Sequence, residues 1–132
     1  MTQLYDEDTA IGATPIIVEE KASFEIFKAG DFVKVTGVTK GKGFQGVVKR
    51  HGFHGGPKSH GQKDRLRAPG SIGSTAMQRV VPGKKMAGRM GGNKRSIKNI
   101  KVVAIDVEKQ IIFLRGAVPG NAQTRVFVTK NI

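Results

Sequence analysis

Apolar and polar residues alternate along several stretches of the chain, and this two-residue period is typical of half-buried β-strands. Val33 and Val35, for example, alternate with Lys34 and Thr36. Alternation of this kind, or a run of β-branched residues, predicts strands at residues 32–36, 100–107, 111–115 and 124–129. No stretch shows a sustained helical period with capping residues, so the chain is predicted to be mainly β.

The connections between these strands are short. Residues 108–110 have the length of a hairpin loop, and residues 117–121 (AVPGN) carry a turn signal. Residues 23–28 (SFEIFK) are compatible with a short strand or with a helical turn, and the pattern leaves both open. Because so few strands are available, a short-strand barrel is favoured over a sandwich.

Residues 40–101 interrupt the strand pattern. They hold sixteen of the 23 Lys and Arg residues, 13 of the 18 Gly, all three His and a single acid, Asp64. Only about a fifth of the segment is Ile, Leu, Val, Met or Phe, too little to offset ~1–2 kcal/mol of backbone entropy per residue. The segment is therefore predicted to be a long functional loop, mobile when free and ordered against a polyanion.

The charge balance narrows the function. The chain carries 23 Lys and Arg against 10 Asp and Glu, a net charge of +13, which favours a polyanionic partner. A solvated surface normally mixes charges of both signs, and residues 40–101 do not. An irregular, Gly-rich segment suits the crevices of folded RNA better than the regular groove of duplex DNA. RNA binding is therefore predicted, and a sequence-nonspecific DNA-binding protein is the alternative.

Membrane and catalytic classes fit less well. No apolar run approaches the ~20 residues that span a bilayer, and the basic segment lacks the regularly spaced bulky residues of a membrane-surface helix. Residues 41–46 match G-x-G-x-x-G, but no helix follows, so close approach of the backbone to phosphate explains these glycines better than a nucleotide site. Asp64 is flanked by bases and is a poor general base. No enzyme, cofactor or small-molecule substrate is predicted.

A metal site is also not predicted. His51, His54 and His60 lie close together in the sequence, as in some zinc sites. The surrounding Lys and Arg residues would repel a divalent cation, and the chain contains no Cys. Imidazoles with a structural or RNA-contacting role are favoured.

Four segments carry recognisable motifs: residues 35–50 (VTGVTKGKGFQGVVKR), 67–73 (RAPGSIG), 83–91 (GKKMAGRMG) and 116–120 (GAVPG). Together they resemble the bacterial type of the ribosomal protein L3 family of the large ribosomal subunit, from about Phe24 to the end of the chain. The resemblance implies a translation-protein-type β-barrel from which a long basic loop reaches through ribosomal RNA toward the peptidyl transferase centre. It also implies direct, early binding of the large-subunit rRNA, with neighbouring large-subunit ribosomal proteins as further partners.

The start of the chain departs from this family. Residues 1–22 are acidic and carry none of its motifs, and they are left unassigned. The family's Gly- and Lys-rich first barrel strand and the subdomain inserted after it are not found, which leaves the closure of the barrel open. The chain is then a fragment, a split or reduced homologue, or a protein whose missing strand comes from elsewhere. Because the start resembles neither a secretory signal nor a transit peptide, a cytoplasmic location on the ribosome is predicted.

One modification is not expected. Some bacterial members of the family carry a modifiable Gln shortly after the Gly-Ser-Ile-Gly motif. Residues 74–76 (STA) follow that motif here, and Gln78 is out of register.

The predicted organisation has three parts: the unassigned residues 1–22, barrel strands from residues 23–39 and 100–132, and a basic RNA-binding arm from residues 40–99. The residues expected to contact rRNA are the bases of the arm and the small, aromatic and polar residues of its motifs. They are Lys40, Lys42, Gly43, Phe44, Lys49, Arg50, His51, His60, Arg65, Arg67, Ser71, Lys84, Lys85, Arg89, Lys94 and Arg95.

Overall fold

The computed structural model describes residues 1–6, 9–19 and 26–130 and divides into two compact units. One unit combines residues 1–40 with residues 93–132 and is called the sheet unit below. The other comprises residues 41–92 and is called the arm unit. Because the sheet unit is built from both ends of the chain, the arm unit is an insertion between two of its strands.

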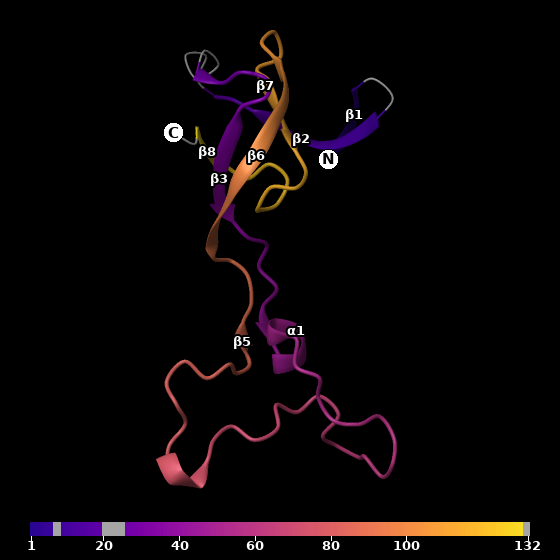
Figure 1. Cartoon of the computed structure of the whole chain (residues 1–132), viewed down its shortest axis with the longest axis vertical. Helices are drawn as coiled ribbons and strands as arrows, with labels where there is room; N and C mark the ends of the chain where they lie inside the picture. Colours follow the sequence, from indigo (N-terminus) through magenta and orange to yellow (C-terminus); the bar gives the residue numbers. More distant parts are fainter. Residues whose placement is uncertain (7–8, 20–25, 131–132) are drawn as a thin grey trace. The chain divides into compact units, whose positions relative to one another are not determined.

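The described residues of the sheet unit form six antiparallel strands (Figure 1). In chain order these are β1 (Thr2–Asp6), β2 (Thr9–Ile17), β3 (Phe32–Val38), β6 (Lys94–Asp106), β7 (Ile111–Arg115) and β8 (Phe127–Lys130). Their order across the sheet is β1-β2-β7-β6-β3-β8. The prediction of a mainly β fold is confirmed. The sheet is not closed into a barrel, because β1 and β8 are its two edges and no strand among the described residues joins them.

Strand β6 starts earlier than the alternation pattern predicts. It begins at Lys94, and Val38 and Gly37 of β3 pair with Lys94 and Arg95. Because these basic residues show no apolar alternation, the sequence pattern predicts them in the arm. They extend the strand because β3 is long enough to pair with them while their charged side chains remain exposed.

The unassigned start of the chain forms a hairpin that joins the sheet. Strand β1 pairs with residues 9–13 of β2, and β7 pairs with residues 13–17. Proline is rare in strand interiors because it cannot donate a ladder hydrogen bond. Pro15 is tolerated here because it lies beyond the residues of β2 that pair with β1. The hydroxyl of Thr14 donates to the Gly116 carbonyl at 2.6 Å and fixes the hairpin to the end of β7.

The choice left open for residues 23–28 is not decided by the structure. Residues 23–25 lie outside the described part of the chain, and residues 26–28 form no strand.

The core of the sheet unit lies on one face of its three central strands. The core side chains, each at most 7% exposed, come in pairs from β3, β6 and β7: Val33, Val35, Ile100, Val102, Ile112 and Leu114. The register explains this grouping, because Val33 pairs with Ile100 and Val102 pairs with Leu114. Residues that alternate with them point to the opposite face, as the two-residue period requires.

The loop between β7 and β8 crosses closely over β3. A Cβ atom at Gly37 would lie 2.7 Å from the Pro119 carbonyl oxygen, a backbone atom. Pro119 is itself buried. Gly37 therefore lets the loop cover the end of the core, and a larger residue would force the loop away.

The arm unit contains only short elements. They are β4 (Phe44–Gln45), α1 (Val47–His51), the 3-10 helix η2 (Thr75–Met77) and β5 (Gly88–Arg89). Strands β4 and β5 pair with one another in a two-stranded sheet. None of the helices in the described parts of the chain has both the length and the hydropathy to cross a membrane.

Gly37→Ala is expected to lower the free energy of unfolding by about 1–3 kcal/mol, because the added methyl group meets backbone that cannot rotate away. Gly41→Ala is the matched control, since a Cβ at Gly41 meets nothing within 4 Å. Urea denaturation followed by circular dichroism measures both. Equal midpoints for the two variants would show that the loop over Gly37 contributes nothing to stability.

A second prediction concerns Asp31, just before β3. Its carboxylate lies 2.7 Å from the Lys130 ammonium of β8 and accepts a hydrogen bond from the Lys28 N–H at 3.0 Å. The bond to Lys130, and then that to Lys28, hold the pKa of Asp31 below its ordinary value. The ionised carboxylate therefore stabilises the folded chain above about pH 4, and this contribution is lost as the pH falls through the folded-state pKa.

Asp31→Asn should accordingly be less stable than the unmodified chain near neutral pH and should lose less stability on acidification below about pH 4. Urea midpoints measured across this range give the comparison. Asp64→Asn, at an exposed position in the arm unit, is the control and should follow the unmodified chain. A pH profile for Asp31→Asn parallel to that of the unmodified chain would contradict the assignment.

Candidate nucleic-acid interface

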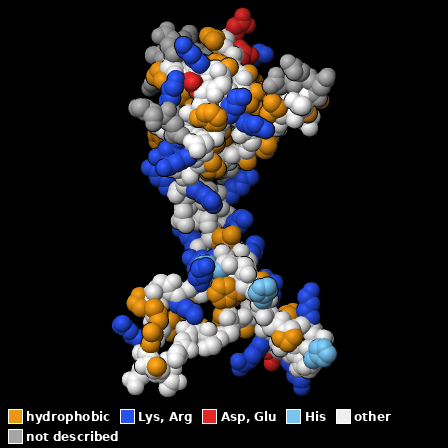
Figure 2. Space-filling model, viewed as in Figure 1, with side chains coloured by type: hydrophobic (Ala, Val, Ile, Leu, Met, Phe, Trp, Pro, Cys, Tyr) orange, Lys and Arg blue, Asp and Glu red, His pale blue; other side chains and the backbone are white. Residues whose placement is uncertain are grey.

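The positive charge of the chain is concentrated in the arm unit. Residues 41–92 contain eleven Lys and Arg against one acid, Asp64, whereas the sheet unit contains twelve Lys and Arg against nine acids. Ten of the eleven arm bases are exposed among the residues that the structure describes, Arg50 being half-buried. Figure 2 shows these side chains in blue along the unit that carries α1, with little of the red that marks Asp and Glu.

The arm unit has almost no apolar core. Of its described residues, Val47 alone is buried, at 4% exposure. Large apolar side chains such as Phe44 and Met77 are 76% and 62% exposed. Apolar burial therefore contributes little to the conformation of this unit. It also does little to compensate the repulsion among the unit's Lys and Arg side chains.

Hydrogen bonds nevertheless organise the two ends of the arm unit. Phe44 pairs with Arg89 and Gln45 with Gly88 in the β4–β5 sheet. Two further backbone bonds extend this pairing: the Lys42 N–H donates to the Met90 carbonyl at 2.8 Å, and the Met90 N–H donates to the Gly43 carbonyl at 2.9 Å. The segment was predicted to be irregular, and this short pairing is local order that the sequence pattern does not indicate.

Helix α1 presents two side chains to one carbonyl of the returning chain. Arg50 Nη1 donates to the Met86 carbonyl at 2.7 Å, and His51 Nε2 lies 3.0 Å from the same oxygen. A carbonyl only accepts, so Nε2 carries the hydrogen in this arrangement. We call these three residues the Met86 clasp. A Cβ at Gly88 would lie 2.8 Å from Arg50 Nη1, so glycine leaves room for the guanidinium beside the clasp.

Two of the residues predicted to contact RNA, Arg50 and His51, form intramolecular contacts in the clasp. Arg50 and His51 contact the protein itself and hold the two ends of residues 52–86 together. A guanidinium carries five N–H donors, so one bond to Met86 leaves Arg50 capacity for a phosphate. No sequence pattern marks Met86, because its role belongs to a backbone carbonyl.

The sixteen predicted residues, Arg50 and His51 included, fall into three groups. Lys40, Lys94 and Arg95 are exposed in the sheet unit where β3 ends and β6 begins. Near this point the Thr39 N–H donates to the Asn93 carbonyl at 3.0 Å. The hairpin and the clasp bring together a second group: Lys42, Gly43, Phe44, Arg50, His51 and Arg89. A third group is exposed and is not gathered into one pocket: Lys49, His60, Arg65, Arg67, Ser71, Lys84 and Lys85.

The three histidines are not assembled as metal ligands in the described residues, where no group of three or more His, Asp or Glu could hold a metal ion. His51 is engaged by the Met86 carbonyl, and its ring lies 6.1 Å from that of Phe53, centroid to centroid. His54 and His60 are exposed. The arrangement offers many separate cations to an extended anionic partner rather than one enclosed site.

Comparison with known proteins gives one family. The family model described as Ribosomal protein L3 matches residues 11–110. Three similar relatives are each named large ribosomal subunit protein uL3. That of Bacillus cytotoxicus is 49% identical over 111 residues, covering 84% of this chain and 52% of the relative. That of Stenotrophomonas maltophilia is 50% identical over 123 residues, covering 92% and 56%. That of Chlorobaculum tepidum is 56% identical over 97 residues, covering 73% and 46%.

The family match also covers part of the acidic N-terminal segment. The family match begins at residue 11, so part of the segment left unassigned by its sequence belongs to the family region. This part includes most of β2, which pairs with β7 in the sheet. The chain spans about half the length of the curated relatives that it matches.

The Met86 clasp predicts the behaviour of the chain without a partner. Arg50→Gln should raise the hydrogen-exchange rates of the Lys42 and Met90 amides by about fivefold, because a hydrogen bond of this kind is worth about 1 kcal/mol. Gly88→Ala should do the same, since its methyl group would displace the guanidinium.

Lys49→Gln is the control, because it removes a charge from the same helix at an exposed position. It should leave both exchange rates unchanged. If Arg50→Gln and Gly88→Ala exchange no faster than Lys49→Gln, the clasp does not stabilise the hairpin.

Proposed function

Because the chain belongs to the ribosomal protein L3 family, we propose that it is a structural component of the large ribosomal subunit that binds large-subunit rRNA directly through its arm unit. The observation that carries this proposal is the arm unit itself, with eleven bases, one acid and almost no apolar core. Such a segment gains most from a partner that supplies many fixed negative charges. The ribosomal protein L3 family is structural and non-enzymatic, in agreement with the prediction that the chain is no enzyme.

The finer parts of the proposal follow from the family resemblance. The arm extends toward the peptidyl transferase centre, binding supports early subunit assembly, and neighbouring ribosomal proteins share the surface. The sixteen residues predicted from the sequence remain the proposed rRNA contacts. Arg50 and His51 combine this role with the Met86 clasp.

Folded RNA is preferred over duplex DNA on structural grounds. Proteins that read the DNA major groove insert a helix or a two-stranded ribbon. Helix α1 has five residues, and the β4–β5 pairing joins only two residues on each strand. Irregular backbone with exposed cations suits the phosphates that line the crevices of folded RNA.

The salt dependence of binding tests the electrostatic part of this proposal. Lys84→Gln/Lys85→Gln should bind large-subunit rRNA more weakly, and its log–log salt slope should be shallower by about 0.7–0.9 for each lost phosphate contact. Lys109→Gln is the matched control, because Asp106 lies 3.6 Å from the Lys109 ammonium in the sheet unit.

The same titration with duplex DNA of equal length separates the two nucleic acids. The unmodified chain should bind the folded rRNA more tightly at every salt concentration. Equal affinity for the two, or a salt slope that the double variant leaves unchanged, would argue against the proposal.

A further inference from the structure

The sheet unit carries a second cationic feature, away from its core. Val102 of β6 and Leu114 of β7 form a cross-strand pair whose side chains point into the core. Lys101 directly precedes Val102, and Arg115 directly follows Leu114. By the two-residue alternation of a strand, Lys101 and Arg115 both point to the opposite face, here called the outer face. They are therefore two like charges on neighbouring strands.

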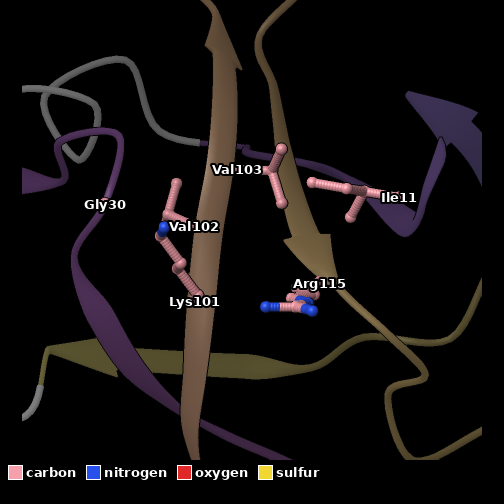
Figure 3. Close-up of a pocket in the computed structure, with 6 residues that line it drawn as sticks. All are labelled: Ile11, Gly30, Lys101, Val102, Val103 and Arg115. Carbon is pink, nitrogen blue, oxygen red and sulfur yellow. The ribbon is translucent and has the colours of Figure 1, made fainter. Parts of the chain in front are cut away.

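These two residues contribute to the lining of a hollow of about 120 Å³. It is lined by Ile11, Gly30, Lys101, Val102, Val103 and Arg115. Figure 3 shows the side chains of Ile11 and Val103 close to one another, with Arg115 near this apolar pair and Lys101 across the strand, beside Val102. The hollow thus combines an apolar wall with two cations.

The two cations lack an acidic partner among the residues that the structure describes. In the described part of the chain, neither Lys101 nor Arg115 takes part in an ion pair. Asp31, near the hollow in sequence, is engaged by Lys130 at 2.7 Å. Like charges on adjacent strands destabilise a sheet, and an anion placed between them would remove that cost.

An exposed aromatic ring stands beside the pair. Phe32 of β3 is the cross-strand partner of Lys101, so its side chain lies on the same outer face, and it is 55% exposed. Exposed aromatic rings beside cationic side chains are how sheet surfaces hold single-stranded nucleic acid. The ring stacks on a base while the cations hold the backbone.

We propose that the outer face at Lys101, Arg115 and Phe32 is a second RNA-binding surface, which takes one phosphate in the hollow and stacks one unpaired base on Phe32. This inference rests on the proposed function, since it assumes an RNA partner. It differs from the arm in what it recognises: the arm supplies separate charges, whereas this surface selects an unpaired nucleotide.

The test uses the full chain and large-subunit rRNA. Lys101→Gln/Arg115→Gln should lower affinity by about tenfold or more and make the log–log salt slope shallower by about 0.7–0.9 per lost contact. Phe32→Ser should weaken binding by about fivefold to a hundredfold with an unchanged salt slope, because stacking releases no counterions. The different effects on the slope separate the two roles.

Matched controls come from the same sheet. Phe127→Ser removes a ring of 68% exposure from β8, which pairs with β3 at Thr36, four residues from Phe32. It should change affinity by about twofold or less. Lys109→Gln removes a charge that is paired with Asp106 at 3.6 Å in the β6–β7 turn, and it should leave the slope unchanged. Urea midpoints near that of the unmodified chain establish that each variant is folded.

Three results would overturn the inference. The first is a sheet double variant that binds like the unmodified chain while Lys84→Gln/Lys85→Gln still weakens binding, in which case the proposed function survives. The second is competition by inorganic phosphate at millimolar concentration with no effect of Phe32→Ser, which would indicate a free-phosphate site. The third is stronger binding of a poly-glutamate peptide than of single-stranded RNA to this face, which would indicate a protein partner. If neither double variant changes the binding of rRNA, the proposed function itself fails.

Discussion

Repulsion among the bases of the arm unit is the constraint on which the rest of the structure depends. Eleven Lys and Arg and one acid share 52 residues, and apolar burial offsets little of their repulsion, since Val47 is the one buried residue described there. A polyanion removes the repulsion by exchanging mobile counterions for fixed phosphates. The arm unit is therefore suited to a bound state in which RNA supplies the order that a hydrophobic core would supply elsewhere.

The paired strands of the sheet unit hold together the two ends of this charged segment. Strands β3 and β6 lead into the arm and out of it, and they remain paired up to Val38 and Lys94. The hydrogen bonds between Thr39 and Asn93 continue the contact to the boundary of the unit. The cost of closing a long loop grows slowly with its length, so a paired base tolerates a long insertion. Within the arm, the Met86 clasp and the β4–β5 pairing close a smaller loop of the same kind.

Hydrophobic alternation predicted the central strands because their core residues come from single faces. Val33 and Val35 show the period clearly, and β7 and β8 lie close to the predicted ranges. The N-terminal hairpin could not be found in this way, because Pro15 lowers the strand propensity of β2 and is tolerated only where β1 has ended. The start of β6 was missed because its residues pair through the backbone and keep their charges in water.

The candidate site was predictable in its charge and not in its geometry. Composition alone indicated a polyanionic partner, because the net charge depends on how many Lys, Arg, Asp and Glu residues the chain has and not on their positions. The role of Met86 depends on where a backbone carbonyl lies after folding. The hollow beside Lys101 and Arg115 depends on the register of β6 and β7. Neither leaves a pattern in the sequence.

Lysine acetylation of the assembled large ribosomal subunit, read by mass spectrometry, tests the central claim most directly. The account predicts that six lysines of the arm unit react in the free chain and are protected in the particle: Lys42, Lys49, Lys58, Lys63, Lys84 and Lys85. Lys109, at the β6–β7 turn with its side chain 74% exposed, is the internal reference for a lysine outside the arm. If the arm lysines remain as reactive in the particle as they are in the free chain, the arm does not lie on RNA and the account is contradicted.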